Sequence, residues 1–295
     1  MNVSDMKSRF SPGLTLALAA FMIALSGLAL WYLGRGGHLE SAFVRDSQKA
    51  QLVSRLRADL YAAAEAEKSA VLAETDAASQ ENARRAQAAA EQVAAGLTEF
   101  KALPVGNPEE AELLRRFEEA FGEYRKADEE VLALAVQNTN LKALALSFGA
   151  ATASLGEMEQ ALRPLLDGPN DKQARQAQRA LSEALRIQAL HAPHIMEKTD
   201  PRMDALEKDM AISDKAVRSA LASLGKEQAA VKTLAAYDQY WKLTGEITTL
   251  SRQNTNVRSL ALSLDRKVKV LAACDAALRM LEEDVRERMA SKATR

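Results

Sequence analysis

"QNTNLKALAL" occupies residues 137–146, and "QNTNVRSLAL" occupies residues 253–262. The same four polar residues therefore occur twice, each time directly before an apolar run. Over the twelve residues that start at Gln137 and at Gln253, eight positions are identical at an offset of 116 residues. We interpret this identity as the trace of a duplicated helical segment.

The similarity extends beyond the two polar segments. At the same offset Tyr124 pairs with Tyr240, and further upstream "ETD" at 74–76 matches "KTD" at 198–200 at an offset of 124. The difference of eight residues is about the length of "LPVGNPEE" at 103–110, so an insertion or deletion at that turn explains it. We therefore predict a helical hairpin that is present in two copies.

The composition favours helices. Hydrophobic residues make up 47% of the 295 residues but aromatic residues only 5%, and the abundant Ala, Leu, Glu, Lys, Arg and Gln lose little freedom in a helix. With 39 basic and 40 acidic residues, the chain has no basic excess that would indicate nucleic-acid binding. Cys274 is the single cysteine, which excludes an internal disulfide. We predict an all-α protein that does not bind nucleic acid.

Helix-breaking residues divide the chain. The segment 103–110 contains two prolines and a glycine, "LDGPND" at 166–171 is a second break, and a weaker one surrounds Gly225. The segments between the breaks would be about 80–100 Å long as continuous helices. We predict four rods that run up, down, up and down in a long four-helix bundle, with a first hairpin at 36–166 and a second at 171–292.

Apolar residues spaced by three and four draw a heptad seam on three of these rods. On the second rod the seam consists of Leu141, Leu144, Phe148, Ala151, Leu155, Met158, Leu162 and Leu165. On the fourth rod it consists of Val257, Leu260, Leu264, Leu271, Cys274, Leu278 and Leu281, with Lys267 as an interruption. The late part of the first rod contributes Ala86, Ala90, Val93, Leu97 and Phe100.

An uncharged stretch, "LTLALAAFMIALSGLALWYL", lies at 14–33. Twenty helical residues span ~30 Å, which matches the hydrocarbon core, and Trp31 with Tyr32 suits the membrane interface. The alternative is a cleaved signal peptide with Gly27 and Ala29 before the cut, but the apolar run exceeds the usual signal core. We predict a short cytoplasmic tail at 1–13 and a transmembrane signal anchor at 14–33, which places the body outside the cytoplasm.

Four polar clusters fall at a similar distance from the predicted hairpin tips. Thr75, Asn138, Thr199 and Asn254 each lie 25 to 30 residues from the nearest tip, which is ~40 Å along an uninterrupted helix. We predict that these clusters form one polar layer inside the bundle. Its candidate residues are Thr75, Asp76, Gln137, Asn138, Asn140, Thr199, Asp200, Gln253, Asn254 and Asn256.

Buried amides and carboxylates need partners, because each unsatisfied group costs about 1–3 kcal/mol. Two hypotheses account for the layer. The polar groups satisfy one another and fix the helix register, as a buried Asn does in a coiled coil. Alternatively, they surround a small polar ligand between the helices. Asp76 and Asp200 would favour a cationic or hydroxyl-rich ligand.

The remaining motifs do not indicate chemistry. In "HAPHIME" at 191–197, His191 and His194 share a helix face, but no third metal ligand has suitable spacing and no C-x-x-C-H haem motif occurs. Pro193 between them indicates a kink. No phosphate-binding loop, nucleophile elbow or zinc-protease motif is present. We therefore expect no enzyme activity, no catalytic residue, no metal and no cofactor.

A predicted anchor followed by long helices that carry "VQNTNLKALALSF" (136–148) and "RQNTNVRSLALSL" (252–264) resembles the four-helix-bundle sensor region of methyl-accepting chemotaxis receptors. The resemblance covers most of residues 13–290. It implies a body in the periplasm, at a bacterial inner membrane that the one apolar stretch of this sequence would cross once, and dimerisation. It also implies binding of a small molecule or a partner protein, and signalling by a helix displacement.

The sequence differs from these receptors at its end. After Leu281 it reads "EEDVRERMASKATR", without a second apolar span and without the cytoplasmic signalling part. We therefore expect a sensory module that lacks its own output domain and that acts as a homodimer or beside a full-length receptor. The alternative hypotheses are a structural coiled-coil scaffold or spacer whose polar layer fixes the register, and a fragment of a longer receptor.

Overall fold

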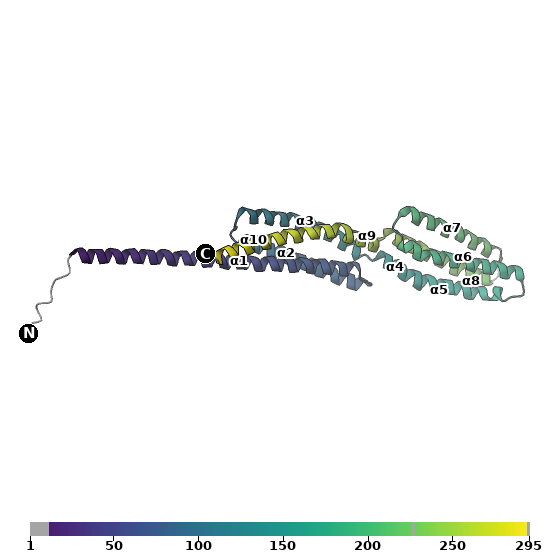
Figure 1. The fold of residues 1–295 in the computed structure, drawn as a ribbon. Helices are drawn as coiled ribbons and strands as arrows, with labels where there is room; N and C mark the ends of the chain where they lie inside the picture. The colour runs from purple at the N-terminus through teal and green to yellow at the C-terminus, as the bar shows by residue number, and fades with distance from the viewer. Residues whose placement is uncertain (1–11, 226–227, 294–295) are drawn as a thin grey trace, which may run out of the picture. The chain divides into compact units, whose positions relative to one another are not determined.

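The computed structural model describes residues 12–225 and 228–293, with side chains for 42–225 and 228–291. All regular elements in these residues are helices (Figure 1), which confirms the predicted all-α class. In chain order they are α1 (Pro12–Val71), α2 (Asp76–Ala102), α3 (Pro108–Ala135), α4 (Thr139–Leu146), the π-helical turn η1 (Ser147–Ala151), α5 (Thr152–Leu166), α6 (Asp171–Met196), α7 (Asp200–Ala222), α8 (Gln228–Gln253), α9 (Thr255–Leu262), the π-helical turn η2 (Ser263–Lys267) and α10 (Val268–Ala293).

The predicted tail at 1–13 and the predicted anchor at 14–33 lie outside the residues whose side chains are described. Positions 14–33 are helical as part of α1. Within the described part of the chain, none of the helices combines the length and the apolar character that crossing a bilayer requires. The membrane anchor therefore stays a prediction.

The chain reverses direction at two places where uninterrupted rods were predicted, namely at 72–75 between α1 and α2 and at 197–199 between α6 and α7 (Figure 1). The prediction of four continuous rods is wrong here, because each junction holds the start of a new helix. The Thr75 hydroxyl caps α2 by accepting a hydrogen bond from the Ala78 backbone N–H at 3.2 Å. Pro201 occupies the first turn of α7, where its missing N–H costs nothing.

The helices follow each other in two similar sets. α1, α2 and α3 correspond to α6, α7 and α8, and α4, η1 and α5 correspond to α9, η2 and α10. The starts of η1 and η2 differ by 116 residues and the starts of α2 and α7 by 124, which are the two offsets of the sequence repeat. We call the residues up to α5 the first copy and those from α6 onward the second copy.

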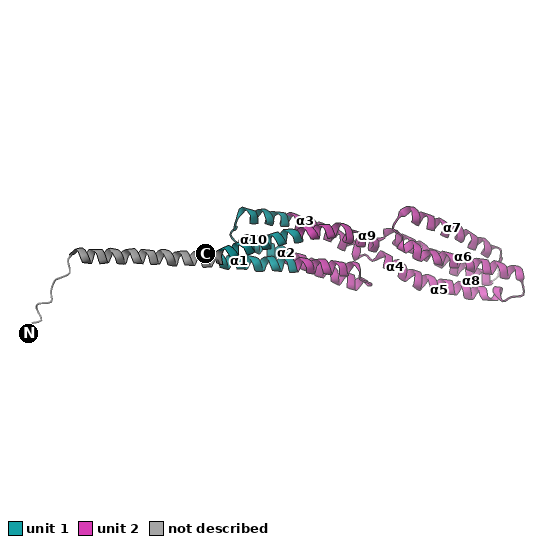
Figure 2. Cartoon of the chain, viewed as in Figure 1, with its two compact units in different colours: residues 1–58, 93–118, 275–295 teal, residues 59–92, 119–274 magenta. Residues whose placement is uncertain are grey.

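The chain divides into two compact units (Figure 2). Unit 1 contains residues 1–58, 93–118 and 275–295, and its described helical residues belong to α1, α2, α3 and α10. A buried ion pair between Lys49 and Glu110 lies in this unit, and Lys49 also donates to the Pro104 carbonyl at 2.7 Å. The buried apolar side chains of unit 1 include Leu52, Val53, Leu56, Val93, Leu97, Phe100, Leu113, Phe117, Leu278, Leu281 and Val285.

Unit 2 contains residues 59–92 and 119–274 and has more than one apolar core. The largest core lies in the four-helix bundle of α5, α6, α7 and α8. Two smaller cores lie where the end of α1 packs against α2 and α3. They consist of Ala70, Ala83, Ala86 and Leu132, and of Val71, Val131 and Ala135.

The two copies exchange their last helices. α5 belongs to the first copy by sequence but packs against α6 and α8 of the second copy. In return, η2 of the second copy contacts the first copy: Lys267 is bonded to Asp128 of α3, and Arg266 pairs with Glu130 of α3 at 2.9 Å. Each set of three helices is thus completed by a helix from the other copy.

The π-helical turns change which residues of the predicted seams are buried. Phe148 and Leu264, predicted as seam residues, are 67% and 62% exposed, whereas Lys267, predicted as an interruption, is buried. A π turn adds one residue to the helical turn and so rotates the following helix relative to the earlier pattern. After η1 the seam resumes as predicted, with Leu155, Met158, Leu162 and Leu165 buried.

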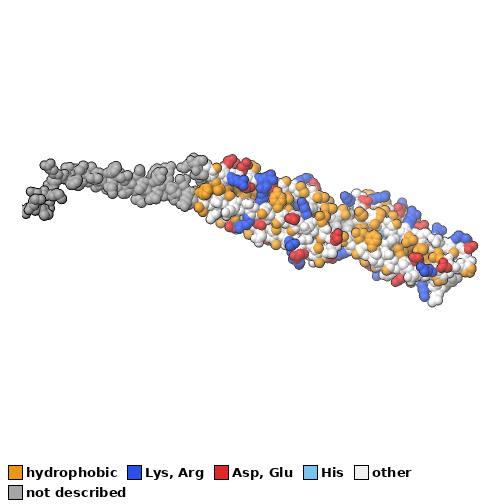
Figure 3. All heavy atoms as spheres, turned by 60° about the horizontal axis from the view of Figure 1, so that its bottom comes forward, with side chains coloured by type: hydrophobic (Ala, Val, Ile, Leu, Met, Phe, Trp, Pro, Cys, Tyr) orange, Lys and Arg blue, Asp and Glu red, His pale blue; other side chains and the backbone are white. Residues whose placement is uncertain are grey.

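The surface carries both signs of charge. On the face that Figure 3 shows, Lys and Arg side chains are interspersed with Asp and Glu and with apolar side chains. Exposed ion pairs such as Arg125 with Glu91 at 2.9 Å contribute ~1 kcal/mol or less each. The stability of the fold therefore depends mainly on the apolar cores and on the buried polar groups within them.

Candidate functional site at the crossing of the two copies

At each of the two QNTN segments the chain leaves the three helices of its own copy and continues against helices of the other copy. Each of these segments turns at an asparagine in the left-handed backbone conformation. Asn138 has φ 51° and Asn254 has φ 53°, and they are the non-glycine residues with positive φ among the described residues. Asparagine tolerates this conformation better than most residues do. The turn ends α3 or α8 and starts α4 or α9 directly afterwards.

The first N–H groups of a helix lack partners within that helix. At the crossing, each new helix receives its cap from the other copy. The Thr139 N–H donates to the Thr255 hydroxyl and the Thr255 N–H donates to the Thr139 hydroxyl, both at 3.2 Å. The Asn140 N–H donates to Asn256 Oδ1 at 3.1 Å and the Asn256 N–H donates to Asn140 Oδ1 at 3.2 Å. The start of α4 therefore depends on α9, and the start of α9 depends on α4.

The asparagine side chains extend this exchange. Asn140 Nδ2 donates to Asn254 Oδ1 at 2.9 Å and to the Ile195 carbonyl at 2.7 Å. In the mirrored position, Asn256 Nδ2 donates to Asn138 Oδ1 at 3.0 Å. The four asparagines predicted for the polar layer therefore meet, and they form one hydrogen-bonded network.

The two outermost amides reach the hairpin turns. Asn138 Nδ2 donates to Asp76 Oδ1 at 2.9 Å, and Asn254 Nδ2 donates to the Glu197 carbonyl at 2.9 Å. The Asn138 amide, followed by Lys142 at 3.3 Å, holds the pKa of the Asp76 carboxyl below its usual value. Asp76 is thus the one predicted acidic residue that joins the network.

The other predicted residues lie outside the network. Gln137 is exposed and donates to the Ala133 carbonyl of its own helix at 2.9 Å, and Gln253 is exposed as well. Thr75 caps α2, and Thr199 lies exposed at the start of α7. Asp200 is 85% exposed, and its Oδ1 lies 3.9 Å from Arg252.

Sequence reasoning missed the two threonines at the centre of the crossing. Thr139 and Thr255 are buried, and their hydroxyls lie 3.1 Å apart. A signal was present, because threonine stands in both copies directly before a helical apolar run, and its hydroxyl is a good cap for a helix start.

A second buried polar group lies in the α5–α8 bundle. His191 of α6 is fully buried, with Nδ1 3.1 Å from the Ser147 hydroxyl and Nε2 3.2 Å from the Thr244 hydroxyl. The ring of Tyr240 stacks on it at a centroid distance of 5.9 Å. Burial lowers the pKa of His191 to about 4, and the nearby His194 contributes in the same direction. The imidazole is therefore neutral at physiological pH, with one nitrogen donating and the other accepting.

The matching positions of the other copy hold charged groups. Lys267 is bonded to Asp128, and its Nζ lies 3.5 Å from Glu67 Oε2 and 4.3 Å from the ring centroid of Tyr124. Burial raises the pKa of both carboxyls, and the Lys267 ammonium opposes this rise. We name these residues the Lys267 cluster. It consists of Glu67, Tyr124, Asp128, Ser263 and Lys267, and by the two offsets it corresponds to His191, Tyr240, Thr244, Ser147 and Ala151.

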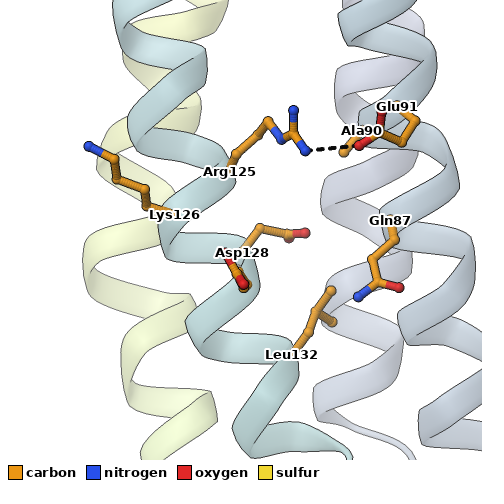
Figure 4. A pocket seen from close by; sticks show the side chains of 8 residues that line it. Gln87, Ala90, Glu91, Arg125, Lys126, Asp128 and Leu132 are labelled. Atoms are coloured by element: carbon orange, nitrogen blue, oxygen red, sulfur yellow. Dashed lines mark hydrogen bonds and ion pairs between the residues drawn. The ribbon is translucent and has the colours of Figure 1, made fainter.

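A groove of about 500 Å³ lies between α2 and α3 and borders this cluster at Asp128 (Figure 4). Arg125 reaches across the groove to Glu91 at 2.9 Å, which Figure 4 marks with a dashed line. The lining contains both signs of charge and one amide. Its residues are Gln87, Ala90, Glu91, Arg125, Lys126, Asp128, Glu129 and Leu132.

The crossing is chemically closed. Asn138, Asn140 and Asn254 are at most 6% exposed, and each of their amides has a protein partner. A ligand at this layer would have to displace one of these hydrogen bonds, so the geometry favours the register-fixing hypothesis over a ligand site within the layer. No cluster of three or more His, Cys, Asp or Glu side chains suited to a metal ion occurs among the residues described.

Residues 13–184 match the model of a family described as a four helix bundle sensory module for signal transduction, in agreement with the resemblance found in the sequence. Among solved structures, the sensor domain of the V. parahaemolyticus histidine kinase sensor TorS is similar with a TM-score of 0.55 and 12% identity, over 82% of this chain and 99% of that domain. A structure of the TorS sensor domain in complex with TorT in the presence of TMAO is similar with a TM-score of 0.44 and 12% identity, over 83% of this chain and 99% of that chain. No curated protein matches the sequence. At this identity the likeness to TorS concerns the fold.

Proposed function

Because the chain belongs to the family of four-helix-bundle sensory modules for signal transduction, we propose that it receives a small polar ligand or a partner protein outside the cytoplasm. The family match, which covers more than half of the chain, carries this proposal. The proposal includes a single anchor at 14–33 in a bacterial inner membrane and a body in the periplasm. A homodimer, or association with a full-length receptor, would bring the signal to an output.

The crossing supplies a route for the signal. α4 and α9 begin at left-handed asparagines, and each depends on the other copy for its helix cap. A shift of α8 therefore moves Asn254 and Thr255, and with them the cap of α4. Because the bonds are reciprocal, a shift of α3 acts on α9 in the same way. We propose that the crossing couples these helices during sensing.

The groove between α2 and α3 is the place we propose for a small ligand. Arg125 and Lys126 offer cations, Glu91 and Asp128 offer carboxylates, and Gln87 offers an amide that can donate and accept. A lining with both signs of charge suits a ligand that itself carries both signs, such as an amino acid. The Arg125–Glu91 pair spans the groove, so a ligand would replace this exposed contact rather than a buried one.

The alternative function is a structural scaffold or spacer. The observation in its favour is the closed network of the four asparagines, which needs no ligand to satisfy it. In that case the network serves to fix the register of α4 against α9 through the reciprocal caps of Asn140 and Asn256.

A thermal-shift screen of the full-length chain in lipid nanodiscs tests the proposal. The compounds are amino acids, organic acids and polyamines, and a ligand at 100 times its Kd should stabilise the fold by about 2.7 kcal/mol. Glu91→Gln with Arg125→Gln should weaken binding. The exchange of an exposed pair outside the groove, Glu112→Gln with Arg115→Gln, is the matched control. The small-ligand function is refuted if none of these compounds stabilises the chain.

A second experiment tests the coupling at the crossing. The hydroxyls of Thr139 and Thr255 are 3.1 Å apart, so Thr139→Cys with Thr255→Cys places two thiols in contact. Once a ligand is known, its effect on hydrogen exchange in α10 is compared between the oxidised and the reduced variant. We expect the ligand effect to shrink on oxidation and to return on reduction. An unchanged effect in both states would show that the signal does not pass through the crossing.

A further inference from the structure

The Lys267 cluster contains a buried carboxylate that the hydrogen bonds of the fold do not satisfy. Glu67 is 0% exposed, and neither of its carboxylate oxygens has a hydrogen-bond partner of good geometry among the described residues. Its nearest cation is Lys267 Nζ, at 3.5 Å from Oε2. The hydroxyl of Tyr124 in the same cluster is also buried and lacks a hydrogen-bond partner among these residues. Such groups are rare in folded proteins and call for an explanation.

The cluster has one ammonium group for two carboxyl groups. Asp128 is bonded directly to Lys267, and this pair is neutral. Glu67 faces the same single ammonium, so a cluster with both carboxyls ionised carries one uncompensated negative charge in the core. A buried charge without a counter-ion is strongly unfavourable, and the group usually takes up a proton instead. A protonated carboxyl, in addition, can donate a hydrogen bond, which an ionised one cannot.

We propose that the Lys267 cluster binds one proton at neutral pH, held on the carboxyl of Glu67, and that loss of this proton loosens the η2 turn. Lys267, whose Nζ lies 3.5 Å from Glu67 Oε2, is the last residue of η2, and Ser263, whose hydroxyl lies beside the carboxyl without a hydrogen bond of good geometry, is the first. The carboxyl of Glu67 therefore contacts both ends of the π-helical turn. Its ionisation changes the forces on the whole turn.

Among the described residues, the elements around Glu67 bring one cation to it. From α3 come Asp128 and Tyr124, and from η2 comes Lys267. α10 contributes Cys274, whose thiol pKa is raised by burial to about 12, so it stays neutral. α2 faces this part of the core with Ala83 and Ala86, which are neutral. Lys267 is thus the cation available to the two carboxyls.

The matching positions of the second copy also support a neutral Glu67. The position of Glu67 is taken there by His191, which is neutral because its pKa is lowered to about 4, and Asp128 and Lys267 are replaced by Thr244 and Ala151. The core at this level is therefore neutral in the second copy. A proton on Glu67 makes the corresponding level of the first copy neutral as well.

The proton can exchange with solvent at one edge of the cluster. Asp128 borders the groove between α2 and α3 (Figure 4), so water in the groove reaches the carboxylate that shares Lys267 with Glu67. A rise in pH would remove the proton and put a charge beside η2. Protonation of Glu67 does not require a ligand, so a ligand screen without a hit would leave it unaffected.

Infrared spectroscopy tests the protonation state directly in the full-length chain. We expect the carbonyl stretch of a protonated, buried carboxyl at neutral pH, which disappears in Glu67→Gln and persists in Glu65→Gln, where an exposed residue of the same helix is changed. A wild-type spectrum at neutral pH without this band would overturn the proposal. This measurement on the wild-type chain holds even if Glu67→Gln folds poorly.

Stability across pH gives a second readout. Burial raises the pKa of Glu67 in the folded state, so its contribution is fully present below the unfolded value of 4.5 and is lost as pH rises through the folded value. Between pH 4.5 and the folded pKa of Glu67, the unfolding equilibrium constant of the wild type should therefore rise relative to that of Glu67→Gln, by up to tenfold per pH unit. Glu65→Gln should run parallel to the wild type. Parallel curves for wild type and Glu67→Gln would contradict the proposal.

Discussion

Replacement of Asn140 by alanine removes the asparagine with the most buried partners at the crossing. Its side chain donates to Asn254 at 2.9 Å and to the Ile195 carbonyl at 2.7 Å, and it accepts from the Asn256 N–H at 3.2 Å. Asn140 is 6% exposed, so water replaces these bonds poorly. At about 1 kcal/mol for each lost bond, we expect Asn140→Ala to cost about 3 kcal/mol.

The matched position provides the control. Asn256 has the same chemistry and the mirrored place, but it makes two such side-chain bonds, to Asn138 Oδ1 and from the Asn140 N–H, and it is only half-buried. We expect Asn256→Ala to cost about 1–2 kcal/mol, because water can reach the groups that lose their partner.

Urea unfolding of both variants and the wild type, followed by far-UV circular dichroism, measures the two losses. A smaller loss for Asn140→Ala than for Asn256→Ala would refute the reasoning, because burial and the number of bonds would then not decide the energy. A loss under ~1 kcal/mol in both variants would show that the crossing is open to water rather than closed.

Three further predictions concern single positions. Asn138→Ala should be less stable than Asn138→Gly by about 1 kcal/mol in the same unfolding assay, because both lose the amide and only alanine is strained at φ 51°; equal stability would contradict this. His191 has a folded pKa of about 4, so wild type should lose up to about 3 kcal/mol relative to His191→Gln as pH falls from 6.5 toward 4, and urea midpoints over this range that keep a constant difference would refute it. Lys267→Met should cost about 3–5 kcal/mol, because it leaves the buried Asp128 carboxylate without its cation; adding Asp128→Asn should restore most of the thermal stability, whereas an additive further loss would exclude this cause.

The sequence was sufficient to predict local structure. Helical composition and the three-and-four spacing predicted the all-α class and buried positions such as Ala86, Val93, Leu97 and Phe100. Composition and spacing reflect contacts between residues that are close in sequence, and the repeated QNTN segments are likewise visible in the sequence itself. The meeting of the four asparagines was predicted as well, although from distances along rods that are in fact interrupted.

The interruptions could have been predicted from capping signals. Thr75 stands before an acidic first residue of α2, and Thr199 stands before Asp200 and Pro201, a combination typical of a helix start. The absence of glycine or proline before Thr75 hid the first of these turns. Helix propensity alone does not distinguish a long rod from two antiparallel helices joined by a capped turn.

The exchange of α5 and α10 could not be predicted from one sequence. Both helices descend from the same segment, so the apolar face of either one fits the three helices of either copy. The π turns were hidden for a related reason, because they shift the seam by one residue without changing its spacing. Burial of Lys267 and exposure of Phe148 depend on this shift. The Lys267 cluster was therefore missed.

The exchange of α5 and α10 between the two copies suggests a way in which such a chain can arise. In a protein with one copy, a last helix directed away from its own three helices by the same left-handed turn would stay unpaired, and two molecules would close on each other to bury both. Joining the genes tethers these partners, so that assembly no longer depends on protein concentration. Cleavage of the link at 167–170 should then leave two fragments that stay associated through the exchanged helices.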